Sequence, residues 1–302
     1  MDDRKKEIPG KKALMIVNPV SGRKAVQKDL TQIVRILMDA GYLVTTAVTG
    51  ERGEGARIAA ALASDYDLLV CAGGDGTLNE CVSGLMRVKS RVPVGYIPCG
   101  STNDIATSRG LPLDAVQAAM RIAAGERTCY DVGLFAERAF IHHALFGAFT
   151  WMAYSTDQEQ KNVLGYGAYI VDALRDLSKI KPLPLRIEAD GSAWDGEFLF
   201  GVISTDRHLA GIFELPEEQI GPADGKLAAA LIRAPKTVLE LEPIVHSILT
   251  GIPDPTAVDI IVSESFQVHA YEAFGWSLDG EGSGLRTDVR MSVEQGALEL
   301  QG

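Results

Sequence analysis

The sequence predicts an α/β fold class: an N-terminal three-layer domain with a mostly parallel sheet, followed by a C-terminal β-rich, sandwich-like domain. Three observations lead to this. Up to about residue 125, short apolar runs alternate with amphipathic segments, which is the pattern of βαβ units. From residue 128, strand-like runs follow one another with few helices between them. The chain has 302 residues, 46% of them hydrophobic and 23% charged, enough for a large core in two domains.

The first domain opens with the apolar run Ala13–Val17, which is long enough for a buried strand and too short for a helix. Apolar residues then recur at helical spacing from Leu30 to Leu37, and Gly41 can end that helix. The later runs predict, in order, a strand over 42–48, a helix over 56–62, a strand over 67–71, a helix over 78–86, a strand over 93–97 and a helix over 113–124 that ends at Gly125.

In the second domain, six strands are predicted, over residues 130–135, 140–149, 185–189, 198–204, 227–233 and 257–270. Helices over 165–177 and 238–249 are the exceptions. The predicted boundaries are therefore residues 1–127 for the first domain and 128–293 for the second. The C-terminal tail, about residues 294–302, could pack back on the first domain.

Charge and composition exclude several classes of function. The chain has 29 Lys and Arg against 40 Asp and Glu, a net charge of −11, so it lacks the basic surface of a nucleic-acid binder and of a protein that adheres strongly to anionic lipid. The N-terminus lacks a signal-peptide pattern, and no apolar run reaches the roughly 18 residues of a membrane span. Four cysteines without CxxC spacing argue against a disulfide framework or zinc site. These features predict a cytoplasmic protein without a transmembrane segment.

Three glycine-containing turns, Asn18–Gly22, Gly73–Glu80 and Pro98–Asp104, each follow a predicted strand of the first domain. In an open α/β sheet, ligands bind at the carboxyl ends of the strands. Glycines allow close approach of the backbone, and the N–H groups that open a helix attract phosphate. One such turn alone would more often be an ordinary tight turn, but three at one edge predict phosphate binding.

Neither of two standard phosphate motifs fits. In the GxGxxG pattern, Asn79 occupies the place of the third glycine. The pair Gly225-Lys226 is followed by Leu227 rather than by Ser or Thr, so it is not a P-loop. The sequence therefore predicts neither a Rossmann dinucleotide site nor a P-loop.

Taken together, these turns resemble the diacylglycerol kinase catalytic-domain family, soluble lipid kinases that include bacterial diacylglycerol kinases and sphingosine and ceramide kinases. The resemblance covers nearly the whole chain. Gly-Gly-Asp-Gly-Thr alone is shared with NAD kinases and resembles a phosphofructokinase turn, whereas Asn103-Asp104 and Asn18–Gly22 point to the lipid branch. The first domain is then expected to be the nucleotide-binding domain and the second to hold the lipid acceptor.

For the nucleotide, the resemblance implies ATP contacts from Asn18, Ser21, Gly22, Thr49, Gly74, Asp75, Gly76, Thr77, Leu78, Asn79, Glu80 and Ser101. A carboxylate among phosphate-binding amides would repel phosphate unless it acts through Mg²⁺. Asp75 is therefore assigned to the ATP-bound Mg²⁺. The alternative is an aspartate that only caps the turn.

In the second domain, Asp279-Gly280-Glu281 resembles the family's Asp-Gly-Glu segment, which implies that Glu281 is the general base for the lipid hydroxyl. Asp279 would support Glu281 or the metal. Without the resemblance, this segment would be an exposed turn.

Residues 221–227 resemble an Asp-Gly-x-Leu segment that carries a structural Mg²⁺ in bacterial members of the family. The resemblance implies that the ligands are the Asp224 carboxylate and the backbone carbonyls of Gly221 and Lys226. An ordinary hairpin turn is an equal alternative.

Two departures from the family pattern lie in the acceptor domain. His142 stands at the position of an Asn, and Asp206 lies in a segment where many members have an Asn and a Gly-Gly pair. His142 and His143 are expected to point to opposite faces of a strand, which favours a structural role over a metal site. Leu145 and Phe146 could narrow a lipid pocket, so an acceptor other than diacylglycerol, or a weakened kinase, stays open.

The resulting hypothesis is a lipid kinase, dependent on ATP and Mg²⁺, that transfers the γ-phosphate to a lipid hydroxyl, with diacylglycerol as the first choice of acceptor. The protein would meet its lipid at the membrane surface and bind there transiently. The alternatives are an NAD-kinase-like small-molecule kinase and a nucleotide- and lipid-binding protein that has lost activity. The family also suggests a homodimer, and no nucleic-acid partner is expected.

Overall fold

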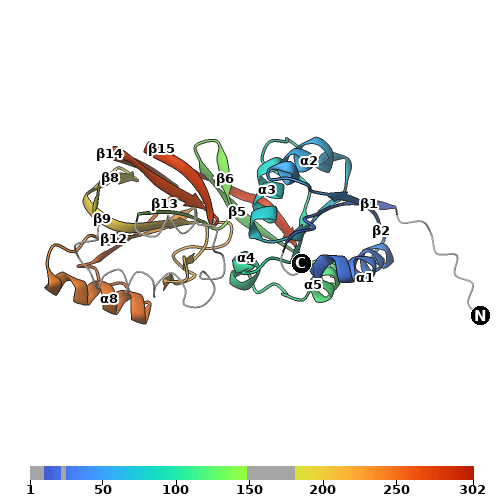
Figure 1. The fold of residues 1–302 in the computed structure, drawn as a ribbon, viewed down its shortest axis with the longest axis horizontal. Coiled ribbons are helices and arrows are strands. Elements are labelled where there is room, and N and C mark those ends of the chain that lie inside the picture. Colours follow the sequence, from blue (N-terminus) through green and yellow to red (C-terminus); the bar gives the residue numbers. More distant parts are fainter. Residues whose placement is uncertain (1–9, 22–24, 148–180) are drawn as a thin grey trace, which may run out of the picture. The chain divides into compact units, whose positions relative to one another are not determined.

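The computed structural model describes residues 10–21, 25–147 and 181–302 (Figure 1). Gly22 and the helix predicted over 165–177 lie outside these residues. The chain is a mixed α/β structure with many strands, as predicted. It divides into two compact units. Unit 1 extends to Tyr130 and includes Ala297–Gly302, and unit 2 is Asp131–Gly296.

Unit 1 contains a sheet in which β2, β1, β3 and β4 lie side by side in that order, each parallel to its neighbours. Parallel neighbours need crossover connections, and helices supply them here. Leu300, near the end of the long strand β15, pairs in parallel with Val94 of β4. The strand bounds are β1 Lys11–Val17, β2 Tyr42–Val48, β3 Leu68–Gly73, β4 Val94–Pro98 and β15 Glu281–Gln301.

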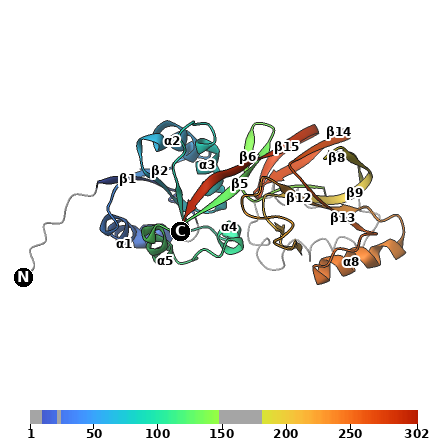
Figure 2. The ribbon, with the colours of Figure 1, turned by 180° about the vertical axis from the view of Figure 1, so that it is seen from behind.

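Helices cover both faces of this sheet, α1 and α5 on one face and α2 and α3 on the other (Figure 2). The core between the sheet and the first pair includes Ile33 and Leu37 of α1, the residues whose spacing predicted that helix. The bounds are α1 Ala25–Asp39, α2 Glu54–Leu62, η1 Ala63–Asp65, α3 Asp75–Leu85, α4 Asp104–Ser108 and α5 Ala115–Ala124.

The clearest differences from the prediction in unit 1 concern helices α3 and α4. Helix α3 begins at Asp75 instead of Leu78, because the glycine-rich segment after β3 is itself the first helical turn. The short helix α4 was not predicted. Helix α5 ends as expected, at Gly125 with a φ of 81°.

Unit 2 is mainly antiparallel, so the chain's strands as a whole do not form a mostly parallel sheet. Hairpin connections produce antiparallel neighbours, and most connections here are short. The strands are β5 Arg127–Phe135, β6 Arg138–Phe140, β7 His143–Gly147, β8 Leu183–Ala189, β9 Ser192–Ser204, β10 His208–Leu209, β11 Phe213–Glu214, β12 Leu227–Arg233, β13 Val258–Ser263 and β14 Ser265–Leu278, with helices η4 Val238–Glu240 and α8 Leu241–Thr250.

Four strands of unit 2, β8, β9, β7 and β14, form a closed ring in which each strand pairs with the next. Strand β9 pairs with β8 through its first half and with β7 and β12 through its second half, and β14 likewise pairs with both β8 and β7. The expected sandwich-like layers are therefore joined by the same strands. The enclosed core contains Trp276, whose ring centroid lies 5.0 Å from those of Phe135 and Phe146.

Two predicted strands of unit 2 are each interrupted. The run over 257–270 is split at Glu264, where the Ser263 hydroxyl accepts the N–H of Ser265. The run over 140–149 is broken at Ile141 and His142, and residues 148–149 lie outside the described part of the chain. Strand β15 was missed because its glycines and polar residues are typical of a turn.

Candidate active-site residues

The turn between β3 and α3 keeps its shape through two glycines. A β-carbon on Gly73 would lie 2.5 Å from the Oγ1 of Thr77, so no larger residue fits there. The Gly74 carbonyl accepts the N–H groups of Thr77 at 3.0 Å and Leu78 at 3.1 Å. The first N–H groups of a helix have no acceptor within the helix, so the start of α3 can donate hydrogen bonds to an anion.

The turn after β4 contacts this turn directly. A β-carbon on Gly100 would lie only 2.7 Å from the Cα of Gly74. Asn103 closes the second turn, since its Oδ1 accepts the Gly100 N–H at 2.7 Å and its Nδ2 donates to the Gly100 carbonyl at 3.1 Å. Asn103 has a φ of 52°, a conformation that asparagine tolerates better than most residues. Ser101 is exposed on the same turn.

Asn18 and Thr49 join the turns after β1 and β2 to this edge. The Asn18 Nδ2 donates to the Thr77 Oγ1 at 3.1 Å, and its Oδ1 accepts the Val20 N–H at 3.1 Å. Thr49 is buried, and its backbone N–H donates to the Val17 carbonyl. Ser21 follows in the turn after β1. The structure thus brings together four segments that the sequence assigned to nucleotide contact.

Asp75 caps the short helix α4. Its carboxylate accepts the N–H of Asp104 at 3.0 Å and the N–H of Ile105 at 3.2 Å, together with the hydroxyls of Tyr96 and Thr102 at 3.3 Å each. Burial, followed by the Asp75 charge, raises the pKa of Asp104. Burial and the same charge also raise the pKa of Tyr96. These contacts cap α4 and not the turn that Asp75 itself belongs to, and they leave the magnesium assignment a prediction.

Glu80 holds the start of α2. Its carboxylate accepts the N–H of Gly53 at 2.6 Å and the N–H of Gly55 at 3.0 Å. The nearby Asn79 accepts the Ser83 hydroxyl at 3.4 Å, and Leu78 is fully buried. Glu80 therefore has a structural role, the positioning of the start of α2, in addition to its predicted contact with the nucleotide.

In unit 2, Asp279 binds three consecutive backbone amides. Its carboxylate accepts the N–H groups of Ile141 at 2.8 Å, His142 at 3.0 Å and His143 at 2.9 Å. The His142 carbonyl accepts the Ser204 hydroxyl, and the Ile141 carbonyl accepts the Thr205 hydroxyl. Hydrogen bonds to its backbone N–H groups and to its carbonyls therefore both hold the segment between β6 and β7 in place.

The prediction that the two histidine rings point to opposite faces is wrong. The ring centroids of His142 and His143 lie 4.4 Å apart, and both side chains are buried. The physical reason is that His142 lies between strands, in the segment bound by Asp279, so the alternation of a regular strand does not apply. At the other departure, the Asp206 Oδ1 contacts the His208 Nδ1 at 3.0 Å.

Glu281 begins β15, two residues beyond the anchored Asp279, and pairs in register with Leu278. Asp279 and Gly280 form the turn between β14 and β15, with φ angles of 46° and 81°. Glu281 is half-buried. The candidate base therefore lies next to a turn that is fixed by hydrogen bonds.

The predicted magnesium segment is a turn closed by its own aspartate. The Asp224 carboxylate accepts the N–H groups of Gly221 at 2.9 Å and Lys226 at 3.0 Å. Among the described residues, no three His, Cys, Asp or Glu side chains form a group that could hold a metal ion. A magnesium ion here would therefore depend on Asp224 and backbone carbonyls, which are hard oxygen ligands of the kind it prefers.

Sequence reasoning missed Asp131, which supports this turn. Its carboxylate accepts the N–H groups of Gly225 at 2.8 Å and Gly296 at 2.7 Å, and the residue is 1% exposed. Burial raises the pKa of Asp131, with a smaller contribution from the Asp224 charge, against the lowering effect of the amides. A charged residue next to an apolar strand run was the available signal.

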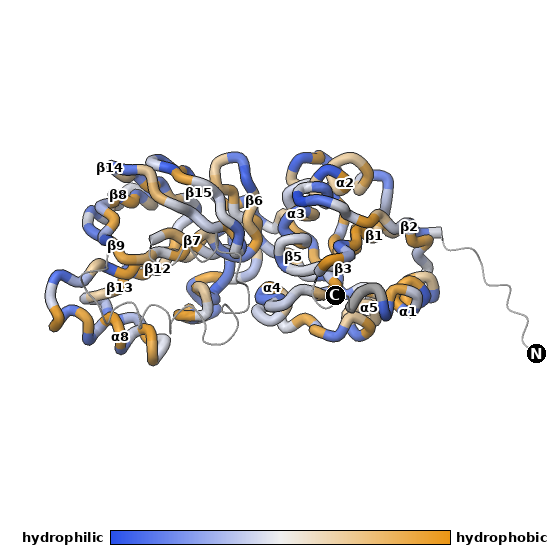
Figure 3. The backbone as a smooth tube through the Cα atoms, in the orientation of Figure 1, coloured by the Kyte–Doolittle hydropathy of each residue, from blue (hydrophilic) through white to orange (hydrophobic). Residues whose placement is uncertain are grey.

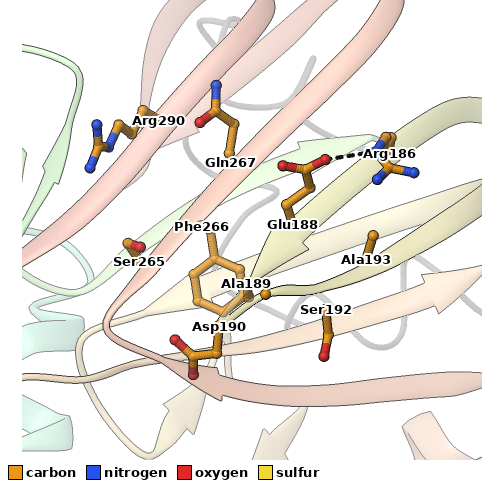
Figure 4. Close-up of a pocket in the computed structure, with 11 residues that line it drawn as sticks. Arg186, Glu188, Ala189, Asp190, Ser192, Ala193, Ser265, Phe266, Gln267 and Arg290 are labelled. Carbon is orange, nitrogen blue, oxygen red and sulfur yellow. Dashed lines mark hydrogen bonds and ion pairs between the residues drawn. The ribbon is translucent and has the colours of Figure 1, made fainter.

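A pocket of about 400 Å³ lies elsewhere in unit 2, against β8, β9, β14 and β15 (Figure 4). The guanidinium of Arg186 at this pocket is already paired, with Glu188 at 2.7 Å and Asp195 at 2.8 Å. None of the predicted site residues lines the pocket. It therefore has no part in the site described above.

Comparison with known proteins agrees with the resemblance. The model of the diacylglycerol kinase catalytic domain matches residues 12–135. A diacylglycerol kinase of Bacillus subtilis (strain 168) is 32% identical over an alignment of 283 positions, which covers 90% of this chain and 92% of the relative. One from Staphylococcus saprophyticus is 34% identical over 206 residues, 68% of each chain.

Solved structures are similar over almost the full length. A diacylglycerol kinase structure from Bacillus anthracis superposes with a TM-score of 0.77 at 25% identity, covering 96% of each chain. A second structure from that organism gives a TM-score of 0.81 at 24% identity, over 96% of this chain and 97% of the other. The fold described above is therefore shared with these proteins.

Proposed function

The chain belongs to the diacylglycerol kinase catalytic-domain family and is a lipid kinase, and from this premise we propose that it phosphorylates diacylglycerol with ATP and Mg²⁺. The acceptor hydroxyl oxygen bonds to the γ-phosphorus, the bond from that phosphorus to the ADP oxygen breaks, and the hydroxyl proton goes to a base. The products are phosphatidic acid and ADP. The observation that carries the nucleotide assignment is the backbone contact between Gly74 and Gly100.

That contact supports phosphate binding because it gathers backbone at the carboxyl edge of parallel strands without side chains in between. The amides at the start of α3 would donate to phosphate oxygens, and the Asn18–Thr77 hydrogen bond holds the neighbouring turn against them. Ser21, Thr49 and Ser101 add hydroxyls along the edge. Asp75 would give up some of its hydrogen bonds to α4 and bind the ATP-associated Mg²⁺ instead. That ion would neutralise phosphate charge during transfer.

Glu281 is the proposed general base. An alcohol is too weak an acid to ionise beforehand, so a carboxylate has only to orient the hydroxyl and accept its proton as the phosphorus–oxygen bond forms. The neighbouring Asp279 is committed to three amides, which suits a residue that fixes the hairpin more than one that moves protons. Asp224 with the carbonyls of Gly221 and Lys226 would hold a structural Mg²⁺.

The test is a product assay on the full chain with ATP, Mg²⁺ and a panel of diacylglycerols and sphingoid bases. We expect phosphatidic acid, and we expect Glu281→Gln to lower kcat by about 10²- to 10⁴-fold with ATP affinity unchanged. Glu272→Gln, an exposed glutamate of the same unit, is the matched control and should keep full activity.

Other results would select the alternatives. A phosphorylated water-soluble product would indicate an NAD-kinase-like small-molecule kinase. ATP binding without turnover, unchanged by Glu281→Gln, would indicate a nucleotide- and lipid-binding protein. A phosphorylated sphingoid base would mean that the acceptor is not diacylglycerol, an outcome that the departures at His142 and Asp206 leave open.

We also propose that the enzyme meets its substrate by transient binding to a membrane surface. Among the helices in the described part of the chain, none has the length and apolarity needed to cross a bilayer. The net charge of −11 opposes strong electrostatic adhesion. A homodimer, which the family suggests, would be tested by sedimentation velocity.

A further inference from the structure

Helix α8, the short helix η4 before it and Ile252 just after it carry a group of exposed apolar side chains. Val238, Leu239, Leu249 and Ile252 are 71%, 83%, 70% and 66% exposed. We call these four residues the α8 apolar surface. Among the described residues of unit 2, only Tyr271 and Leu285 are other large hydrophobic side chains with comparable exposure. Figure 3 shows hydrophobic residues alternating with hydrophilic ones along this segment.

Helix geometry places part of this surface on the outer side of α8. Another side of α8, with Ile244 and Ile248, packs into the core of unit 2. Val238 and Leu239 belong to the 3-10 helix η4, which leads directly into α8, and Leu249 lies in the last turn of α8. Glu242 and His246 of α8 are also exposed, so the solvent-facing side of this segment carries polar side chains together with the apolar ones.

Side-chain hydrogen bonds hold the backbone of this segment at both ends. Before the helix, the Glu240 carboxylate accepts the Lys236 N–H at 2.8 Å and the Thr237 hydroxyl at 3.2 Å. After it, the Thr250 hydroxyl accepts the N–H of Ile252 at 3.3 Å. The exposed apolar residues therefore lie on a backbone segment that hydrogen bonds hold in place. Their exposure adds nothing to the stability of the monomer, because they bury little surface.

Charge identifies the kind of surface that this face would meet. Over residues 234–256 there is one Lys against two Glu and one Asp, so the net charge is 1 − 3 = −2 with the histidine neutral. Anionic lipid headgroups would therefore repel this segment. Aliphatic side chains instead gain free energy by entering the boundary between headgroups and acyl chains, whatever the headgroup charge.

We propose that the α8 apolar surface is the part of unit 2 that inserts into the lipid bilayer in which the substrate resides. This inference rests on the proposed membrane-surface function. An enzyme whose acceptor lies in a bilayer needs a contact with that bilayer, and a chain of net charge −11 cannot rely on electrostatics for it. Insertion of aliphatic side chains supplies a contact that is reversible and insensitive to salt.

The test is co-sedimentation of the full chain with phosphatidylcholine vesicles containing diacylglycerol, without ATP, so that binding is measured apart from catalysis. The variant carries Val238→Ser, Leu239→Ser, Leu249→Ser and Ile252→Ser. We expect its vesicle partition coefficient to fall more than about ten-fold, and wild-type binding to be equal at low and high salt. The matched control replaces four exposed apolar residues of unit 1, Met38, Leu62, Leu113 and Met120, by Ser, and should bind as the wild type does.

A second measurement guards against misfolding of the fourfold variant. The single change Leu249→Trp should give fluorescence that brominated phosphatidylcholine quenches beyond the wild-type level. Quenching equal to wild type, vesicle binding unchanged by the four serines, or no vesicle binding by the wild type would each overturn the proposal. So would a wild-type dimer that the serine variant converts to monomer, since the surface would then bind a second copy. Failure of the kinase assay alone would leave the binding result standing.

Discussion

Gly100 and Gly74 meet backbone to backbone: a β-carbon on Gly100 would lie 2.7 Å from the Cα of Gly74 and 2.9 Å from the Oδ1 of Asn103. The two glycines come from turns after different strands. Their contact fixes how those turns sit against each other, and the proposed phosphate site depends on it. Any side chain at Gly100 must push the turns apart.

We therefore expect Gly100→Ala to destabilise the protein by about 1–3 kcal/mol, as overpacking does, and to weaken ATP binding more than about ten-fold. Urea unfolding and nucleotide titration would measure the two effects. Gly10→Ala is the matched control, because its β-carbon meets nothing within 4 Å. Wild-type affinity for ATP in Gly100→Ala would contradict the assignment.

Asp279→Asn tests the three-amide anchor. An asparagine has a single acceptor oxygen, so at least one N–H between Ile141 and His143 loses its partner, at a cost of about 1–3 kcal/mol. We expect kcat to fall while the KM for ATP stays constant, because the neighbouring Glu281 is displaced.

The control for this change is Asp190→Asn. Asp190 and Gly191 form a similar turn, with φ angles of 48° and 77°, but the Asp190 carboxylate accepts the Ser263 hydroxyl, a bond that an asparagine oxygen can keep. We expect kcat close to wild type there. Equal losses in both variants would mean that the turn conformation, and not the amide anchor, matters.

Asp104 should make stability depend on pH. Its pKa is raised in the folded state, by burial and then by the Asp75 charge, so the protonated form is favoured on folding. That contribution is fully present below the unfolded pKa of about 3.9 and is lost as the pH rises through the folded pKa. We expect the unfolding free energy of Asp104→Asn, relative to wild type, to increase from pH 3 to pH 7. Urea titrations at several pH values would measure it, and a constant difference would contradict the sign.

The proposed structural Mg²⁺ at Asp224 predicts a metal-dependent melting temperature. An ion that binds only the folded state stabilises by an amount that grows with its concentration. Without nucleotide, we expect the wild-type Tm to rise with Mg²⁺ and the Tm of Asp224→Asn to respond much less. Asp195→Asn, at an exposed carboxylate of the same unit, should behave as the wild type. Equal responses in all three proteins would instead favour the hairpin-turn interpretation.

The local spacing of apolar residues predicted most of the helices and strands of unit 1. The apolar run at 13–17 and the spacing from Leu30 to Leu37 reflect single elements that bury one face, so the sequence carries that information within a few residues. The start of α3 was placed too late because glycine has a low helix propensity, whereas the turn needs glycine for close packing against Gly100.

Unit 2 was harder because its interruptions come from residues distant in the chain. The break at Ile141 and His142 is caused by Asp279, well over a hundred positions away. The same contact brought two histidine rings together that strand alternation would separate. Long-range hydrogen bonds of this kind leave no local signal.

The sequence by itself determined the family and the identity of the candidate residues, because their chemistry is written in short motifs of glycine, hydroxyl and carboxylate groups. The tertiary structure alone decided what those carboxylates bind: Asp75 caps α4, Glu80 holds α2 and Asp279 anchors the segment before β7. The physical reason is that a carboxylate takes whichever N–H groups the fold places within hydrogen-bond distance, and those donors belong to segments that only folding brings near.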